Sequence, residues 1–329
     1  MAATVAVLGV IGGCAPGQAG QSGPPAAPLT SRPETSAPAT PASTPAARPP
    51  VGKLGEYRAA QRAYAFTEDR GAGAAPRILN VSVRTPVVAV KADYGGTGLF
   101  PLIVFAPGYR QCAGSYSALL QQWASAGYVV AAVQFPLTNC HIADPDESDL
   151  TNQPEDVAFV ISRLLRLSEQ AAGPLAGLVD ASQIAVAGHS DGGDTMAALA
   201  AAACCRDGAV RAAIILAGAQ WPAFTGHWFA ESPPPMMFVQ GTADTWNPPA
   251  ASVQLYQADT TGPRYYLDLP GADHFSPYEG SATPEPVVAT VTLDFRNAYV
   301  AGEKSSLAAM WQAGQVRGVS VLVSGGRMP

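Results

Sequence analysis

Short apolar runs alternate with segments of helical periodicity along the chain after about Leu54. The predicted strands cover residues 78–84, 99–106, 128–133, 184–188, 212–216, 236–240 and 265–269. The predicted helices cover residues 116–126, a segment that opens at Pro154, 191–200, 250–257 and 284–313, the last with a break at 301–302. Several of the strands are continuously apolar, as strands covered on both faces are. The pattern therefore predicts an α/β fold with a doubly wound, mainly parallel sheet and helices on both faces.

The first 50 residues depart from this pattern. An apolar run at residues 4–11 leads to Gly12-Gly13-Cys14, which resembles a secretory leader that ends in a bacterial lipobox. The run is too short to span a bilayer, and no Lys or Arg precedes Arg32, so the usual basic start of a leader is missing. The alternative is an ordinary apolar N-terminus with a chance cysteine.

Residues 15–50 are dominated by Pro, Ala, Ser, Thr and Gly. Such a segment buries too little apolar surface to offset the entropy lost on ordering, so we predict a disordered linker. The predicted organisation is a leader at residues 1–14, a linker at 15–50 and one folded domain at 51–329. With Cys14 acylated, the protein would be an exported cell-surface lipoprotein, and without acylation it would be secreted.

The composition and charge of the chain indicate which kinds of molecule it is expected to bind. Of the 329 residues, 48% are hydrophobic, which is enough for a large core, and only 13% are charged, with a net charge of −6. The sequence carries no basic run typical of proteins that bind nucleic acid or a membrane surface. We therefore expect no nucleic-acid partner, and membrane attachment only through a lipid on Cys14.

The segment Gly188-His189-Ser190-Asp191-Gly192 lies between a predicted strand and a predicted helix, and it fits the G-x-S-x-G elbow of nucleophilic serines. Such an elbow holds the serine in a strained conformation with its hydroxyl exposed. The flanking residues must be Gly, because side chains there would collide with neighbouring elements. The backbone N–H of Asp191 would stand at a helix N-terminus, where it can bind an oxyanion. The alternative is a Gly-rich turn with a chance serine in a chain of 33 glycines.

A serine nucleophile needs a base, and the chain offers four histidines. His274 lies in a loop just past a predicted strand, where catalytic groups of parallel sheets collect, so we predict that it is the base. His189 adjoins the serine in sequence and is expected to lie beneath the turn. His141 and His227 fall in other loops, and no two histidines share a metal-ligand spacing. We therefore expect neither a metal nor a cofactor.

The acid that orients the base is expected between the serine and the histidine in the chain. Asp244 follows the predicted strand at 236–240, although it would also suit a helix N-cap. Asp268 lies within a strand and Asp273 directly precedes the histidine, so both are less well placed. The loop after the strand at 99–106 offers the backbone N–H of Tyr109 as second oxyanion donor, and its ring could form the floor of the acyl pocket.

The order Ser190, Asp244, His274, each in a loop past a strand, resembles that of the α/β-hydrolase superfamily. The segments that resemble its chlorophyllase, dienelactone-hydrolase and platelet-activating-factor-acetylhydrolase-like group are Phe105–Tyr109, Asn152–Val157, Gly188–Gly193 and Gly271–Phe275. The Pro-Gly-Tyr loop and Trp221 are also similar to cutinase-type polyester hydrolases, which usually carry Met where this chain has Asp191. The resemblance implies an α/β-hydrolase fold, with Tyr109 and Trp221 in contact with substrate.

Four cysteines remain besides Cys14. Cys112 and Cys140 follow adjacent predicted strands at one sheet edge, so they would form a disulfide in an oxidising compartment or else remain two buried thiols. For Cys204 and Cys205 the sequence offers no interpretation.

Together these features predict a serine carboxylic-ester hydrolase that acts on small or medium acyl esters by a Ser190–His274–Asp244 triad. Its partner would be a small-molecule or polymeric ester. One alternative is a cutinase-like hydrolase of polyesters or lipids. An alternative from another class is a non-catalytic surface lipoprotein that binds a ligand, but a binding protein has no need of all three triad residues.

Overall fold

The computed structural model of the chain describes residues 51–71, 73, 75–88, 98–280 and 283–325. The leader, its Cys14 and the linker lie outside these residues. All described residues belong to Pro45–Pro329, one of the two compact units into which the chain divides. None of the described helices is long and apolar enough to cross a bilayer.

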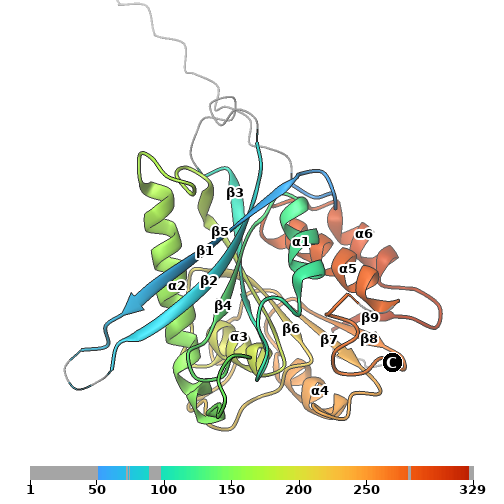
Figure 1. Cartoon of the computed structure of the whole chain (residues 1–329). Coiled ribbons are helices and arrows are strands. Elements are labelled where there is room, and N and C mark those ends of the chain that lie inside the picture. Colours follow the sequence, from blue (N-terminus) through green and yellow to red (C-terminus); the bar gives the residue numbers. More distant parts are fainter. Residues whose placement is uncertain (1–50, 72, 74, 89–97, 281–282, 326–329) are drawn as a thin grey trace, which may run out of the picture. The chain divides into compact units, whose positions relative to one another are not determined.

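A single nine-stranded sheet runs through this unit in the order β1-β2-β4-β3-β5-β6-β7-β8-β9 (Figure 1). The strands are β1 (Ala59–Glu68), β2 (Arg77–Pro86), β3 (Phe100–Ala106), β4 (Val129–Gln134), β5 (Val179–His189), β6 (Val210–Leu216), β7 (Met236–Gly241), β8 (Arg264–Leu269) and β9 (Val321–Ser324). The six strands from β4 to β8 in this order pair in parallel, and β1, β2 and β9 pair antiparallel at the two edges. The predicted doubly wound, mainly parallel sheet is therefore confirmed.

Helices lie between most of the strands that follow one another in the chain from β3 onwards. They are α1 (Ser117–Ser125), α2 (Gln153–Glu169), α3 (Asp191–Ala201), α4 (Pro249–Ala258), α5 (Pro284–Tyr299) and α6 (Ser306–Ala313), and a 3₁₀ helix, η2 (Glu147–Asn152), precedes α2. α2 begins one residue before Pro154, where the sequence predicted its start, and as predicted it carries two acidic residues in its first turn, which suits the positive end of a helix dipole. The predicted break of the last helix is also found, since Gly302 has a φ of 83° between α5 and α6.

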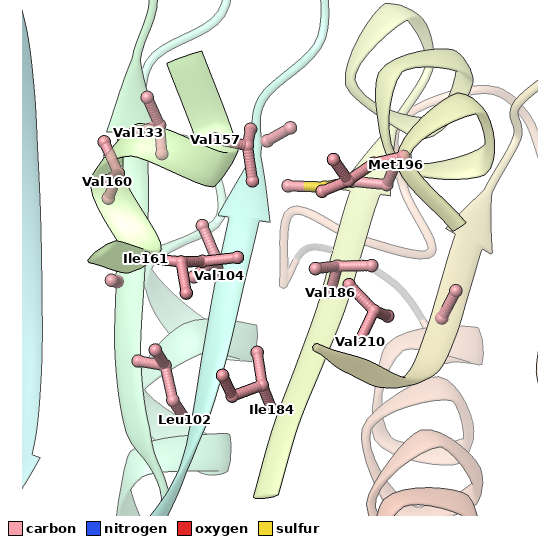
Figure 2. Packing of buried hydrophobic residues seen from close by; sticks show 14 of the residues in the cluster. Leu102, Val104, Val133, Val157, Val160, Ile161, Ile184, Val186, Met196 and Val210 are labelled. Atoms are coloured by element: carbon pink, nitrogen blue, oxygen red, sulfur yellow. The ribbon is translucent and has the colours of Figure 1, made fainter. Parts of the chain in front are cut away.

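Alternate side chains of the strands divide the core into two layers. Leu102 and Val104 of β3 belong to one cluster, together with α2, α3 and α4, whereas Ile103 and Phe105 belong to a second cluster with α1, α5 and α6. Figure 2 shows the first cluster, in which Ile161 of α2 lies against the strand side chains. The helices therefore cover both faces of the sheet, and the carboxyl ends of the parallel strands remain available for the site.

The antiparallel β1–β2 hairpin is held to η2 and α2 by buried charges. The Arg77 guanidinium donates to both carboxylate oxygens of Asp149 at 2.8 Å and to both oxygens of Asp156 at 2.6–2.7 Å. Arg70 adds bonds to Asp156 and Glu68 at 2.7 and 3.0 Å. Because the carboxylates of Asp149 and Asp156 are almost fully buried, their charges depend on these partners.

Candidate active site

Ser190 stands at the turn between β5, which ends at His189, and α3, which begins at Asp191. Its φ of 55° and ψ of −126° lie outside the regions that non-Gly residues ordinarily adopt. The strained turn is held in place because the Ser190 N–H donates to the Leu216 carbonyl of β6 at 2.9 Å. This is the local geometry that a nucleophile elbow requires.

The glycines around Ser190 are needed for close approach of the backbone. A Cβ at Gly188 would overlap the Gly192 carbonyl, and a Cβ at Gly192 would overlap the Ala106 carbonyl at the end of β3. A Cβ at Gly193 would lie 3.1 Å from the Cα of Gly218. Strand, turn and helix can therefore pack at this distance only with Gly at these positions.

His274 lies in the loop after β8 and Asp244 in the loop after β7. The His274 Nδ1 is 2.7 Å from the Asp244 Oδ2, and both side chains are buried. The second oxygen of Asp244 accepts the backbone N–H groups of Trp246 and Asn247, each at 2.9 Å. Asp244 therefore orders its own loop and orients the His274 ring, and it does not cap α4, whose N-cap is Pro248.

The surroundings of the Asp244 carboxyl group favour its ionised form. Burial by itself would raise its pKa, but the hydrogen bond and charge of His274, together with the Asn247 N–H and the Gln240 amide, hold the pKa below its ordinary value. An anionic Asp244 accepts a hydrogen bond from the protonated Nδ1 of His274, which leaves the Nε2 atom of that ring free to accept a proton.

His189 is fully buried beneath the elbow, as expected. Its Nδ1 lies 2.8 Å from the Tyr116 hydroxyl and its Nε2 lies 2.8 Å from the His274 carbonyl. Since a carbonyl only accepts, the Nε2 carries the proton and the Nδ1 accepts from Tyr116. Burial, and next the neighbouring His274, lower the pKa of His189 to about 3, so the ring stays neutral. His189 thus ties the serine turn to the histidine loop.

The loop after β3 lies against the serine turn. A Cβ at Gly108 would come within 3.0 Å of the Ser190 Cβ, and the Gly108 N–H donates to the Tyr116 hydroxyl at 3.2 Å. The Tyr109 hydroxyl donates to the Pro145 carbonyl at 2.8 Å, which fixes its ring at the loop that precedes η2. The next residue, Arg110, has a φ of 59°. The Tyr109 backbone is therefore held next to Ser190.

A disulfide joins Cys112 to Cys140, 28 residues apart, and so connects the loops after β3 and β4. A second disulfide joins the neighbouring residues Cys204 and Cys205 just after α3. Among the described residues, one group of ligand-type atoms is close enough to hold a metal, formed by Cys112, Cys140 and His141. Because both sulfurs are bonded to each other, they offer no thiolate to a metal ion.

Four predicted site residues open onto one pocket of about 560 Å³. Its lining comprises Gly108, Tyr109, Arg110, Gln111, Glu147, His189, Ser190, Asp191, Trp246, Asn247, His274 and Phe275. Asp244 lies behind His274, outside the lining. A larger hollow of about 680 Å³ lies around Ser168 and Glu169 near the end of α2, but no histidine or cysteine lines it. The chemistry is therefore concentrated in the smaller pocket.

Trp221, predicted to contact substrate, does not line this pocket. It packs with Phe224, Trp228 and the buried Leu150 beside α3. Trp246 lines the pocket instead of Trp221. Its side chain is 72% exposed, and its ring stacks on that of His274 with the ring centroids 6.3 Å apart. Sequence reasoning missed Trp246, although its position two residues after Asp244 could have indicated it.

Asp191 occupies the first position of α3 and faces the pocket. It is 8% exposed, and its Oδ2 has no hydrogen-bond partner in the described part of the chain. Burial, and next the negative charge of Glu147, raise the pKa of Asp191 to about 7. The backbone N–H of Asp191 belongs to the first turn of α3, so no helix carbonyl accepts it, and it interacts with the carboxyl group of its own residue.

Comparison with known proteins relates this chain to one protein family. Residues 89–304, about two thirds of the chain, match the family model described as PET hydrolase-like. The matched segment contains β3 to α5 and all residues of the pocket. No curated protein matches the chain.

Proposed function

Because the chain belongs to the PET hydrolase-like family and is thereby an ester hydrolase with the α/β-hydrolase fold, we propose that it acts as a serine carboxylic-ester hydrolase on small or medium acyl esters. The observation that carries the proposal is the 2.7 Å bond between His274 and Asp244 in one site with the strained Ser190. A ligand-binding protein would need neither this pair nor a strained serine.

In the proposed mechanism the Ser190 Oγ attacks the ester carbonyl while the His274 Nε2 takes its proton. The negative charge that develops on the carbonyl oxygen is bound by the backbone N–H groups of Tyr109 and Asp191. The C–O bond to the alcohol then breaks, and the alcohol leaves with the proton held by His274. Water, deprotonated by the same ring, attacks the acyl-enzyme and releases the acid and Ser190.

The Asp191 side chain favours short acyl groups in this proposal. Long apolar chains would lie against this carboxyl group without offering it a hydrogen-bond donor or a cation, which is unfavourable for a buried carboxylate. The second candidate is hydrolysis of polyesters, and the family relation favours it. The exposed ring of Trp246 offers a flat apolar surface on which an aromatic polymer unit could lie.

Hydrolysis of p-nitrophenyl esters from acetate to palmitate, with polyester film alongside, tests the proposal. We expect Ser190→Ala to lower kcat roughly 10⁴-fold or more while the protein stays folded. The control is Ser232→Ala, an exposed serine that does not line the pocket, and it should leave kcat unchanged. Equal activity of the two variants, or none in the unmodified protein, would contradict the proposed function. Release of acid from film faster than from any soluble ester would favour the polyester candidate.

Export and attachment through an acylated Cys14 remain part of the proposal, supported by the apolar run that precedes this cysteine. The full-length protein in a bacterial host should fractionate with membranes, and Cys14→Ala should move it to the soluble fraction. Unchanged fractionation of this variant would contradict the lipid attachment.

A further inference from the structure

Asp191 carries a buried carboxyl group whose Oδ2 has no partner in the described part of the chain. Burying an unpartnered carboxylate costs free energy, so proteins ordinarily give such a group a donor or a cation. The N-cap of α3 is Ser190, and the Asp191 carboxyl interacts with the backbone N–H of its own residue. This interaction leaves Oδ2 without a donor. Because Asp191 lines the pocket beside Ser190, a cation held in this pocket would lie near the charge of its carboxyl group.

Two further side chains point to the chemistry of that partner. Glu147, at the start of η2, lines the same pocket, and its negative charge acts on Asp191. Trp246, 72% exposed, lines the pocket on the side of the Asp244 loop. Two carboxyl groups together with an open indole face match the requirements of a cation better than those of a neutral or anionic group.

The pocket also contains one cationic side chain, Arg110. Its guanidinium lies 5.6 Å from the centre of the Tyr109 ring and is exposed to solvent. Within the described ranges it forms no ion pair with either Asp191 or Glu147. Arg110 therefore does not act as the ion-pair partner of Asp191.

We propose that Asp191, Glu147 and Trp246 form a cation site beside the reacting serine, so that the enzyme, on the premise of the proposed ester hydrolysis, prefers esters that carry a substituted ammonium group. The ammonium lies between the two carboxylates and against the indole face. Each part contributes modestly where water has access, since an exposed cation–π contact alone changes binding only a few-fold. The preference arises because all three act on the same group.

Two matched pairs of esters test this site. On the alcohol side, butyrylcholine is compared with 3,3-dimethylbutyl butyrate, in which carbon replaces the charged nitrogen. On the acyl side, p-nitrophenyl 4-(trimethylammonio)butyrate is compared with p-nitrophenyl 5,5-dimethylhexanoate. In at least one pair we expect kcat/KM for the cationic ester to exceed that for its neutral counterpart about tenfold or more at low salt, and the ratio to fall as salt is added.

Variants show whether this ratio depends on the proposed residues. The double variant Asp191→Asn with Glu147→Gln should bring the ratio close to one, and Trp246→Leu should lower it about three- to fivefold. Glu169→Gln removes one negative charge outside this pocket, so it controls for the net charge and should leave the ratio as in the unmodified protein.

The outcomes separate this inference from the proposed function. Hydrolysis of both neutral esters at rates equal to or above those of their cationic partners would overturn the cation site and leave the esterase standing. A preference that persists in the double variant would also overturn it, because the charge would then be recognised elsewhere. Hydrolysis of none of the four esters would contradict the proposed function and this inference together.

Discussion

His189 shows how one buried side chain can hold three loops of the site together. Its neutral ring accepts from Tyr116 and donates to the His274 carbonyl, and Tyr116 in turn accepts the Gly108 N–H. Burial raises the pKa of the Tyr116 hydroxyl, which therefore remains a donor over the working pH range. Positions of the serine turn, the base and the oxyanion loop thus depend on one chain of hydrogen bonds.

Tyr116→Phe removes the centre of this chain while keeping the ring. We expect kcat to fall several-fold with little change in KM, and the free energy of unfolding to fall by about 1 kcal/mol, because the Gly108 N–H and the His189 Nδ1 lose their partner. Steady-state kinetics and urea unfolding measure the two effects.

Tyr128→Phe is a matched control for Tyr116→Phe. It also removes a buried hydroxyl, bonded to Asn297 at 2.7 Å, but away from the pocket. This variant should lose comparable stability and keep its kcat. The same kcat in both variants would show that the Tyr116 hydroxyl does not position the site.

The raised pKa of Asp191 has a consequence for stability. Its value of about 7 lies above that of an unfolded aspartic acid, so the folded protein binds the proton more tightly. This contribution to stability is present at low pH and is lost as the pH rises through about 7. The titratable side chains that face Asp191 are Glu147, His274 and Asp194, and Arg110 lies on the same pocket wall.

Asp191→Asn should therefore stabilise the protein more at pH 8 than at pH 5, by on the order of 1 kcal/mol, because the amide resembles the protonated acid. Urea unfolding of both proteins at the two pH values measures the difference. A gain of the same size at pH 5 and pH 8 would mean that the Asp191 carboxyl ionises in the fold as it does in the unfolded chain.

Single residues differ in how far the sequence reveals them. Ser190, Asp244 and His274 each follow a strand that the sequence pattern predicts, so their place at one sheet edge could be predicted from that pattern. Glu147, at the start of η2, and Trp246, in a loop, are exposed residues for which no periodicity marks a role. Trp221 follows β6 as expected, but it packs against the buried cluster that contains Leu150 and Phe224, and it does not line the pocket.

At the scale of elements, the β1–β2 hairpin depends on charge as well as on pairing. Arg77 of β2 is the shared partner of the buried Asp149 and Asp156. Removing one partner from a buried ion pair leaves an uncompensated charge, which is more destabilising than the pair itself is stabilising.

Arg77→Met should lower the free energy of unfolding by about 3–5 kcal/mol, because two buried carboxylates would lose this guanidinium. The control is Arg206→Met, which breaks the exposed pair with Glu231 and should cost less than about 1 kcal/mol. Equal losses in urea unfolding of the two variants would contradict a structural role for the buried network.

Most elements could be predicted from the sequence, and the edge strands could not. The central strands are continuous apolar runs because both of their faces are covered. β1 contains mostly exposed residues and β9 has only four residues, so neither carries a clear alternation. The hairpin pairing of β1 with β2 depends on contacts that no local pattern reports.

At the scale of the whole molecule, the mainly parallel sheet explains why the chemistry gathers at one edge. The loops after β3, β5, β7 and β8 supply Tyr109, Ser190, Asp244 and His274 in turn. The two core layers pack against these strands on both faces, so the ends of the strands hold the loops of the site in fixed positions. The family match also covers this part of the chain, whereas the β1–β2 hairpin, α6 and β9 lie outside it.

The most direct measurement of the central claim is covalent labelling with a fluorophosphonate, followed by mapping of the labelled peptide by mass spectrometry. A serine activated by His274 and Asp244 reacts with one equivalent of this reagent. We predict a single label on Ser190, which is absent in Ser190→Ala and strongly slowed in His274→Ala. No label on the folded protein, or a label on another serine that persists in Ser190→Ala, would contradict the account.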